Sequence, residues 1–344
     1  MKSSAPEQAF GRRQHGYDSG FKWIDFKITN RCNRRCVYCG VSHDKPRAAE
    51  RLASETIAST LHDALDLGFT HYALLGGEPS LREDICKVFE PFHGTKKPKS
   101  LMVITNGVRF NEELYRSLFA TDADEATLVF SMDSFRKPNY KFQDPVMCLR
   151  HIMAIKKIAE EYDGHPGRRT VAVHTVISRE NFRDFVKMLD FFGGKDIDVS
   201  LGLVCPAFFL NKGEPGAYNE FTYAELEGIL RNLDELSDSG RLNFGNSTLR
   251  DYLRIFPYGK LRMASTCRAG RQAVIINPDG AVFPCISQSY LGGKSFGNIT
   301  TEPFSAIYLR MQMFSCTWKE SAACWDHFLW DRLAAKSDSG GPIE

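Results

Sequence analysis

The stretch TNRCNRRCVYCG, residues 29–40, carries three closely spaced cysteines: Cys32, Cys36 and Cys39. Thiolates at such spacing are ligands for zinc or for an iron-sulfur cluster. A tetrahedral zinc ion, or a cuboidal cluster with a cysteine on every iron, needs four ligands, so three thiolates leave one position open. Either a fourth cysteine arrives from elsewhere in the chain, or a group that is not protein takes that position.

The cysteines follow the first strand of a regular alternation of strands and helices. FKWIDFKIT (21–29) has the apolar content of a buried strand, and Ser54 and Gly68 are the expected N-cap and stop of the helix that follows the cysteines. The expected strands cover 21–29, 70–77, 100–107, 126–134, 170–178 and 198–205, and the expected helices cover 54–68, 81–92, 111–120, 145–161 and 181–192. This order predicts right-handed βαβ units and an α/β fold with a parallel sheet covered on both faces.

Residues with functional chemistry gather at the ends of these strands. Ligands of a parallel α/β sheet bind beyond the carboxyl ends of its strands. The residues at or just past those ends are Cys32, Gly76, Gly77, Glu78, Asn106, Ser131, Asp133 and Cys205. The sequence therefore predicts a single site at this edge of the sheet.

The alternation stops after residue 210. Thr222 and Glu225 predict a capping box at the start of a packing helix over 222–240. The stretch AVIINPDGAVFPC (273–285) predicts a hairpin, because Pro278 fixes φ and Gly280 accepts a positive φ in the turn between two apolar strands. Such a hairpin returns Cys285 toward the segment that carries Cys267.

The C-x3-C-x2-C spacing, with Tyr38 before the last cysteine and a strand before the first, resembles the radical S-adenosylmethionine (radical SAM) superfamily. In that family three cysteines hold a [4Fe-4S] cluster, and the amino and carboxylate groups of S-adenosyl-L-methionine (SAM) bind the fourth iron. The resemblance covers roughly residues 21–210 and implies a partial (β/α)6 barrel. The alternative is a zinc knuckle, for which His43 is a weak fourth ligand.

The same resemblance implies the residues that contact SAM. GGEP (76–79) matches the segment in which backbone carbonyls accept from the cofactor's amino group, and Glu78 can add charge. Ser131 and Asp133 are two residues apart in VFSMDS, so both can face the cofactor's ribose or carboxylate. The alternatives are a plain turn at Gly76, Gly77 and Asn106, and a helix cap at Asp133. Tyr38, Gly76, Gly77, Glu78, Asn106, Ser131 and Asp133 are thus the expected cofactor-binding residues.

A second cysteine set lies in the last third of the chain. The pattern C-x12-G-x4-C, from Cys267 through Gly280 to Cys285, resembles the opening of the SPASM or shorter twitch extensions of radical SAM enzymes. Only Cys316 and Cys324 follow, so we expect one auxiliary cluster, [4Fe-4S] in type, rather than two. A structural zinc site or buried free thiols are the alternatives.

Composition and these motifs predict the parts of the chain, its partners and its cellular compartment. The 344 residues carry a net charge of +2 and are 43% hydrophobic, which argues against nucleic acid as the main partner. No apolar run is long enough for a membrane span, so a cytoplasmic protein with reduced cysteines is expected. The expected parts are a tail (1–20), the barrel (21–210), a helical linker (211–262), the small auxiliary-cluster domain (263–335) and a second tail (336–344).

The expected function is that of a radical SAM enzyme. It would take an electron from an external one-electron reductant such as flavodoxin or ferredoxin, cleave SAM and abstract hydrogen from a substrate. The abbreviated C-terminal part resembles the dehydrogenases and epimerases of aminoglycoside pathways, which implies oxidation or epimerisation of a sugar or aminocyclitol. The alternative is a maturase that modifies a ribosomally made peptide. Cys205, in line with Val199, Leu201 and Leu203, is either a core residue or a hydrogen donor to a substrate radical.

Overall fold

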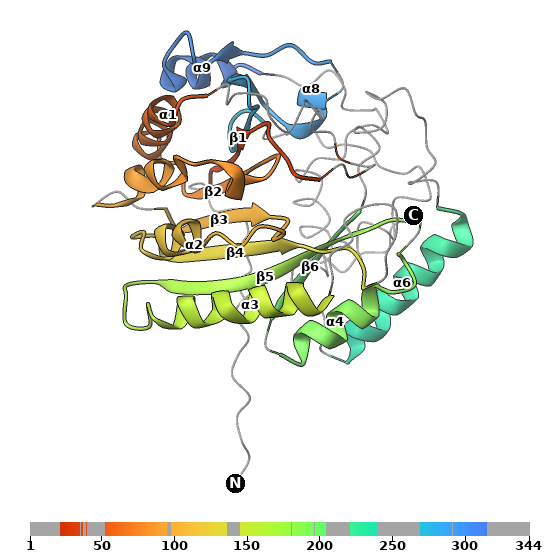
Figure 1. Ribbon diagram of the computed structural model, residues 1–344. Helices are drawn as coiled ribbons and strands as arrows, with labels where there is room; N and C mark the ends of the chain where they lie inside the picture. Colours follow the sequence, from red (N-terminus) through yellow and green to blue (C-terminus); the bar gives the residue numbers. More distant parts are fainter. Residues whose placement is uncertain are drawn as a thin grey trace.

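A computed structural model describes residues 21–34, 36, 39, 52–94, 98–135, 145–179, 181–195, 197–203, 221–239, 269–290 and 292–314. Six parallel strands form the centre of the fold (Figure 1): β1 (Trp23–Thr29), β2 (His71–Gly76), β3 (Ser100–Thr105), β4 (Glu125–Ser131), β5 (Arg168–Ile177) and β6 (Asp198–Leu203). They lie in sequence order, each hydrogen-bonded to the next. All six predicted strands are confirmed.

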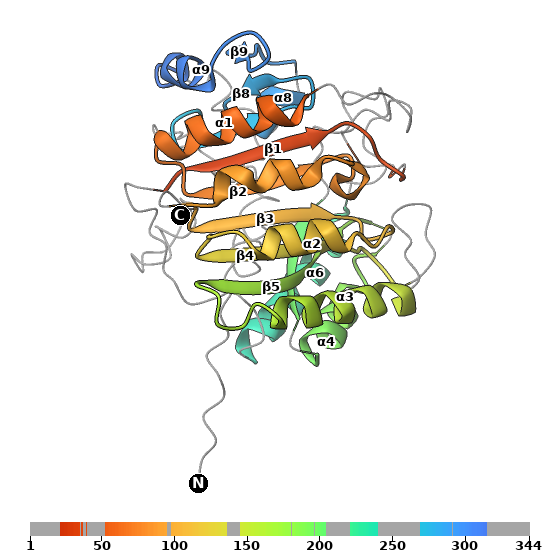
Figure 2. The same ribbon diagram turned by 60° about the vertical axis from the view of Figure 1, so that its left-hand side comes forward.

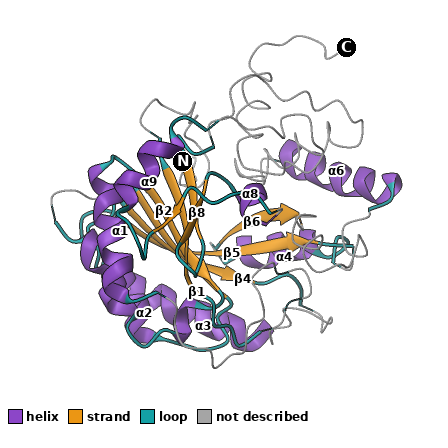
Figure 3. Ribbon diagram, turned by 90° about the horizontal axis from the view of Figure 1, so that it is seen from above, coloured by secondary structure: helices purple, strands orange, loops and turns teal. Residues whose placement is uncertain are grey.

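Helices line one face of this sheet, as the turned view shows (Figure 2). They are α1 (Ser54–Asp66), the 3-10 helices η1 (Pro79–Leu81) and η2 (Ile85–Phe92), α2 (Glu112–Phe119), α3 (Pro145–Glu160) and α4 (Phe185–Gly193). In the view from above, α1, α2 and α3 follow the outside of a curved fan of strands (Figure 3). Among the described residues, the sheet of β1 to β6 is therefore covered by helices on its outer face, not on both faces as the alternation predicted.

Three details of the predicted helices are wrong. Ser54 is the first residue of α1, and Ala53 occupies the N-cap position without a side-chain hydrogen bond. The segment Ile85–Phe92 forms a 3-10 helix and not an α-helix, and Pro91 lies inside its last turn. Finally, α4 starts at Phe185, four residues later than expected.

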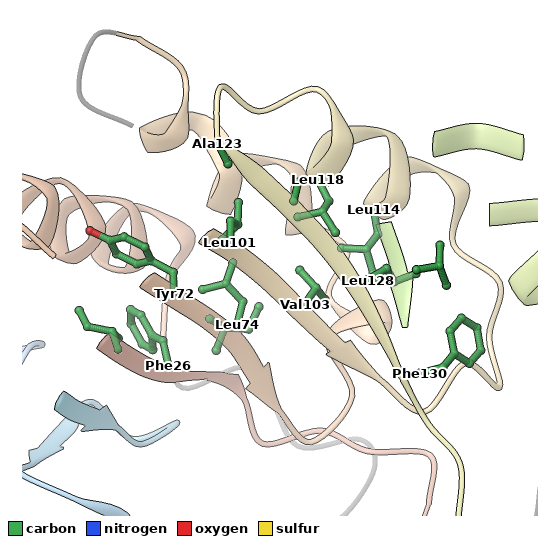
Figure 4. Close-up of a cluster of buried hydrophobic side chains, with 14 of the residues drawn as sticks. Phe26, Tyr72, Leu74, Leu101, Val103, Leu114, Leu118, Ala123, Leu128 and Phe130 are labelled. Carbon is green, nitrogen blue, oxygen red and sulfur yellow. The ribbon is translucent and has the colours of Figure 1, made fainter. Parts of the chain in front are cut away.

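Side chains of alternate strand residues build the core between sheet and helices. Figure 4 shows Phe26, Tyr72, Leu74, Val103 and Leu128 pointing into this layer, and each is fully shielded from solvent. The residues between them in the strands point to the opposite, inner face of the sheet, because side chains alternate along a strand. Many of these are polar, so the inner face holds the chemistry and the outer face holds the core.

The C-terminal hairpin extends the same sheet beyond β1. Its first strand, β7 (Ala273–Ile276), pairs in parallel with β1, and β8 (Ala281–Phe283) and β9 (Gly297–Asn298) follow in antiparallel order. The strand order is β6-β5-β4-β3-β2-β1-β7-β8-β9. The hairpin and its turn at Gly280, with φ of 85°, were predicted; its docking on β1 was not.

Two further helices belong to this C-terminal part. After the short helix α8 (Ile286–Tyr290), α9 (Phe304–Met311) packs beside α1 (Figure 1). The ring of Phe69 lies 5.8 Å from that of Phe304 and 5.0 Å from that of Tyr308. Aromatic packing thus attaches the C-terminal part to the outside of the barrel as well as to its sheet edge.

The helix α6 (Tyr223–Asp238) begins with the predicted capping box, in which Thr222 and Glu225 accept from each other's backbone amides. Of the helices that the structure describes, none is long and apolar enough to cross a membrane.

Candidate functional site

The two glycines at the end of β2 press against the segment that leads from β1 to the cysteines. A Cβ atom on Gly77 would lie 2.0 Å from the carbonyl oxygen of Arg31, and one on Gly76 would lie 2.4 Å from that of Thr29. Gly76 also has a φ of 146°, a conformation that favours glycine. The amides of Gly77 and Glu78 donate to the carbonyls of Thr29 and Arg31, at 2.8 and 2.7 Å. These contacts continue the parallel pairing past both strands and fix the start of the cysteine loop.

The Glu78 carboxylate is fully buried and ties the end of β2 to the end of β3. Its Oε1 accepts from the Thr105 hydroxyl at 2.6 Å and from the Ser80 amide at 3.1 Å. Its Oε2 accepts from the Asn106 amide at 2.7 Å. These three hydrogen bonds satisfy the buried carboxylate and hold both strand ends rigidly. Its contact with SAM, expected from the sequence, stays a prediction.

Arg82 connects the two ends of the cysteine loop by hydrogen bonds. Its guanidinium is fully buried and donates to the carbonyl of Ile28, which precedes the loop, and to that of Leu52, which follows it. Asp84 supplies the counter-charge at 2.7 Å. One side chain therefore holds both ends of the segment that carries Cys32, Cys36 and Cys39.

The cysteines themselves lie beyond the end of β1. Cys36 is buried, and its carbonyl accepts from the amide of Cys39 at 3.1 Å. The amide of Arg34 donates to the Cys32 sulfur at 3.4 Å. Burial raises the pKa of Cys32 to about 11, so the thiol must lose a proton to become a ligand. Among the described residues, no three Cys, His, Asp or Glu side chains converge into a finished metal site.

Asn106 places a carboxamide beside this loop. Its Nδ2 donates to the Oδ1 of Asn33 at 2.8 Å and lies 3.9 Å from the Cys32 sulfur. Its Oδ1 accepts from the amide of Val108, which is the turn chemistry that the sequence also allowed. Asn106 thus does both: it shapes the turn after β3 and contacts the loop that carries the thiols.

Asn30 shows that the site has hydrogen-bonding capacity for a further group. The residue is 5% exposed and lies two positions before Cys32, yet neither its Nδ2 nor its Oδ1 has a hydrogen-bond partner in the part of the chain that the structure describes. Leaving a buried polar group unpaired costs about 1–3 kcal/mol. A bound molecule with both a donor and an acceptor, such as the amino acid portion of SAM, fits this carboxamide. Together with three thiols on one short loop, Asn30 makes the residues present suit a cluster with bound SAM.

A polar row crosses the inner face of the sheet near the carboxyl ends of three strands. Ser131 on β4 pairs in register with His174 on β5, which pairs with Ser200 on β6. The Nδ1 of His174 lies 2.8 Å from the Ser200 hydroxyl. A Cβ atom on Gly202 would lie 3.0 Å from the His174 ring, so the glycine leaves room for it.

Asp133 continues the inner face just past β4. Its Oδ1 accepts from the Val176 amide at 3.0 Å, and its backbone carbonyl accepts from Asn181 at 2.7 Å. The carboxylate therefore joins β4 to β5. Ser131 and Asp133 are both buried at the strand end where the sequence placed them, and their contact with SAM stays a prediction.

Cys285 is buried directly after β8, where α8 begins. Its sulfur accepts from the Gln288 amide at 3.4 Å, and its carbonyl accepts from the Ser289 amide at 3.1 Å. The Gly270 amide donates to the carbonyl of Pro284, so the segment that follows Cys267 runs beside Cys285 as the hairpin predicted. Tyr38, Cys205, Cys267, Cys316 and Cys324 lie outside the described residues.

The sequence reading missed four residues of this site: Asn30, Lys27, Arg82 and Thr105. Asn30 sits inside the cysteine motif, so its position was a usable signal. A lysine in the middle of the apolar strand 21–29 was a second signal, because a buried charge needs a reason. No local pattern marks Arg82 or Thr105, whose partners come from other elements.

Two family models match separate parts of the chain. Residues 26–192 match the family model of the radical SAM superfamily. Residues 267–326 match the model of SPASM, an iron-sulfur cluster-binding domain. The two matches cover the two cysteine sets.

Curated relatives fall into two groups. The GTP 3',8-cyclase of Desulforamulus reducens is 28% identical over 179 residues, which are 50% of this chain and 53% of that enzyme. The PqqA peptide cyclase of Methylobacterium nodulans is 24% identical over 293 residues, which are 84% of this chain and 73% of that enzyme. The PqqA peptide cyclase of Rhizobium meliloti is 24% identical over 296 residues, which are 84% of this chain and 74% of that enzyme. The chain thus spans about half the length of the cyclase from Desulforamulus reducens.

Solved structures share the fold. Streptococcus suis SuiB bound to S-adenosylmethionine superposes with a TM-score of 0.63 over 90% of this chain and 72% of that chain, at 17% identity. The structure of anSMEcpe with bound AdoMet and a Cp18Cys peptide gives a TM-score of 0.53 over 88% of this chain and 87% of that chain, also at 17% identity.

Proposed function

We propose that this chain, which carries a radical SAM domain followed by a SPASM domain, is an enzyme that modifies a ribosomally made peptide. It carries out this reaction with SAM, a [4Fe-4S] cluster and an auxiliary iron-sulfur cluster. The electron comes from an external one-electron reductant.

The extent of the match to the PqqA peptide cyclases carries this proposal. That match runs over 84% of the chain and so includes both the barrel and the C-terminal part. The match to the GTP 3',8-cyclase of Desulforamulus reducens covers 50% of the chain, although its identity is higher. Because a shared fold does not by itself imply a shared function, a match that includes the C-terminal part as well as the barrel weighs more for the substrate.

This proposal replaces the expected sugar or aminocyclitol substrate with the peptide that the sequence offered as the alternative. The expectation of a small molecule rested on the short C-terminal part and the reduced number of late cysteines. Residues 267–326 nevertheless match the SPASM model. The solved structures that share this fold include SuiB bound to the precursor peptide SuiA, with a TM-score of 0.63.

Each set of residues at the site has its own proposed role. Cys32, Cys36 and Cys39 hold the first cluster, and Cys285 with Cys267, Cys316 and Cys324 holds the auxiliary cluster. When bound, the cluster and SAM would supply the one-electron radical chemistry that acts on a C–H bond of the substrate. Tyr38, Gly76, Gly77, Glu78, Asn106, Ser131 and Asp133 form the SAM side of the site. His174 and Ser200 are hydrogen-bonded to each other on the same inner face.

The experiment is anaerobic turnover of the purified enzyme with SAM and dithionite. One set of reactions receives synthetic peptides of mixed sequence, and a matched set receives sugars and aminocyclitols. We expect peptides to raise the release of 5'-deoxyadenosine above the substrate-free rate, with a mass change in the peptide.

Two outcomes contradict the proposal in different ways. Stimulation by an aminocyclitol and not by any peptide would return the function to the small-molecule class. A colourless protein that binds zinc and neither iron nor sulfide would remove the radical SAM chemistry altogether.

A further inference from the structure

A buried lysine links the strand that leads to the cysteine loop with the segment around Cys285. Lys27 is on β1, five positions before Cys32, and its side chain is on the inner face and 5% exposed. A lysine is seldom buried unless it is paired, because taking an ammonium group out of water is costly. Its position on the strand that ends in the cysteine loop is therefore a feature that needs an explanation.

The groups that contact this ammonium come from the C-terminal part. The Nζ of Lys27 donates to the Oδ1 of Asn277 at 2.8 Å, although 250 residues separate the two. It also lies 4.1 Å from the centre of the Tyr290 ring, a cation–π contact. Both of these contact partners are neutral, so opposite charge reaches Lys27 only from groups that act electrostatically, among them the carboxylates of Asp25 and Asp279.

The contacts continue to Cys285. The same Oδ1 of Asn277 accepts from the Ser289 hydroxyl at 3.0 Å, and the Ser289 amide donates to the carbonyl of Cys285 at 3.1 Å. Lys27 thus connects β1, the turn after β7 and the helix that follows Cys285. This joint has the cysteine loop on one side and an auxiliary-cluster ligand on the other.

The charge of Lys27 also acts on the cysteine loop. Cys39 and the carboxylates of Asp25 and Asp279 are near enough to act on Lys27 electrostatically. Burial lowers the pKa of Lys27 to about 8, so the group still carries its proton at pH 7. A positive charge in a medium of low dielectric stabilises a nearby centre that gains an electron. Net charge and solvent exposure are among the factors that set the potential of an iron-sulfur cluster.

We propose that Lys27 is a positioning residue that joins the Cys285 end of the C-terminal part to the cysteine loop, and that its charge raises the reduction potential of the cluster held by Cys32, Cys36 and Cys39. The electron that reduces this cluster comes from a low-potential one-electron donor, which is oxidised in the same step. No proton moves on Lys27. The inference rests on the proposed radical SAM chemistry but does not depend on the nature of the substrate.

The test compares reconstituted holoenzymes by redox titration followed by electron paramagnetic resonance. Lys27→Met removes the charge and keeps much of the side-chain length, whereas Lys27→Arg keeps the charge. Lys22→Met is the matched control. Lys22 donates to the Leu67 carbonyl and lies 5.1 Å from the Tyr308 ring, so it too joins the β1 region to the C-terminal part, but at the opposite end of the strand. The signal that changes when SAM is added identifies the cluster in question.

We expect Lys27→Met to disfavour the reduced cluster about tenfold, which is a shift of about 59 mV to more negative potential for a one-electron couple. Lys27→Arg and Lys22→Met should keep the parent potential. If Lys27→Met does not fold, Asn277→Asp serves instead, because a carboxylate at that position neutralises the ammonium and should shift the potential the same way.

A parent-like potential in Lys27→Met or Asn277→Asp overturns the inference, even if thermal stability falls, because a merely structural lysine would behave in that way. An equal shift in Lys22→Met also overturns it. These outcomes leave the proposed function intact. That function fails separately if the parent protein holds no cluster or makes no 5'-deoxyadenosine with dithionite.

Discussion

The Nη1 of Arg82 lies 2.7 Å from the main-chain oxygen of Ile28, deep inside the fold. The same guanidinium bonds to the carbonyl of Leu52, so one cation holds the chain on both sides of the cysteine loop. Ordinary helix and strand pairing does not reach these two carbonyls together.

Arg82→Met should weaken both the fold and the cluster site. The change leaves two buried carbonyls without their donor and Asp84 without its partner, so we expect a loss of roughly 3 kcal/mol in the free energy of unfolding. Iron content after reconstitution should also fall. Arg116→Met is the control, because Arg116 pairs with Glu112 and Glu161 at the exposed surface and should leave both measurements nearly unchanged. Equal effects from the two variants would contradict the role of Arg82.

Gly77→Ala should damage the site although it adds one methyl group. The new Cβ would lie 2.0 Å from the Arg31 carbonyl oxygen, so the start of the cysteine loop must move. We expect a lower melting temperature and less than half the parent iron. Gly228→Ala, in α6, meets nothing within 4 Å and should be neutral or stabilising by up to about 1 kcal/mol. Full iron content in Gly77→Ala would show that the close approach does not matter.

Asn30→Leu should have opposite effects on stability and on cofactor binding. Leucine has a similar size and removes a buried carboxamide that has no hydrogen-bond partner among the described residues, so the cluster-free protein should gain about 1–3 kcal/mol in stability. Binding of SAM to the reconstituted enzyme should weaken at least tenfold. Thermal unfolding and equilibrium dialysis measure the two effects. A destabilised variant with unchanged SAM affinity would make Asn30 a structural residue.

Cys36→Ala should abolish cleavage of SAM. We propose that Cys32, Cys36 and Cys39 are the protein ligands of the first cluster, so loss of one would leave an iron without its ligand while SAM still requires the open position. Reconstituted Cys36→Ala should make no 5'-deoxyadenosine above background by chromatography. Cys148→Ala is the control, because Cys148 is buried in the hydrophobic core and is not one of the three proposed ligands. Parent-level product from Cys36→Ala would refute the assignment.

Cys267→Ala/Cys285→Ala should retain about half of the parent iron. Two [4Fe-4S] centres would hold about eight irons per chain, and this double variant lacks two of the four cysteines proposed to bind the auxiliary one. Iron and sulfide analysis of the anaerobically purified proteins gives the ratio. An unchanged iron content would show that these cysteines bind no auxiliary cluster, and the four late cysteines would then be core thiols.

Much of the fold was readable from the sequence, because it depends on contacts between near neighbours. Apolar strands, helix patterns and turn glycines predicted the six parallel strands, and Thr222 with Glu225 predicted the capping box that the structure shows. The hairpin around Gly280 follows from the residues of its own turn. The spacing of Cys32, Cys36 and Cys39 indicated the chemistry, since ligand type and spacing are local properties.

The tertiary structure alone decided how these parts meet. Nothing local shows that β7 pairs with β1, that Lys27 bonds to Asn277 across 250 residues, or that Glu78 accepts from Thr105. The glycines at 76 and 77 illustrate the difference: the sequence marked them as cofactor contacts, and the structure adds that Thr29 and Arg31 leave no space for a side chain there. Such contacts join residues far apart in the chain, and they form only after burial of the apolar faces has brought the strands together.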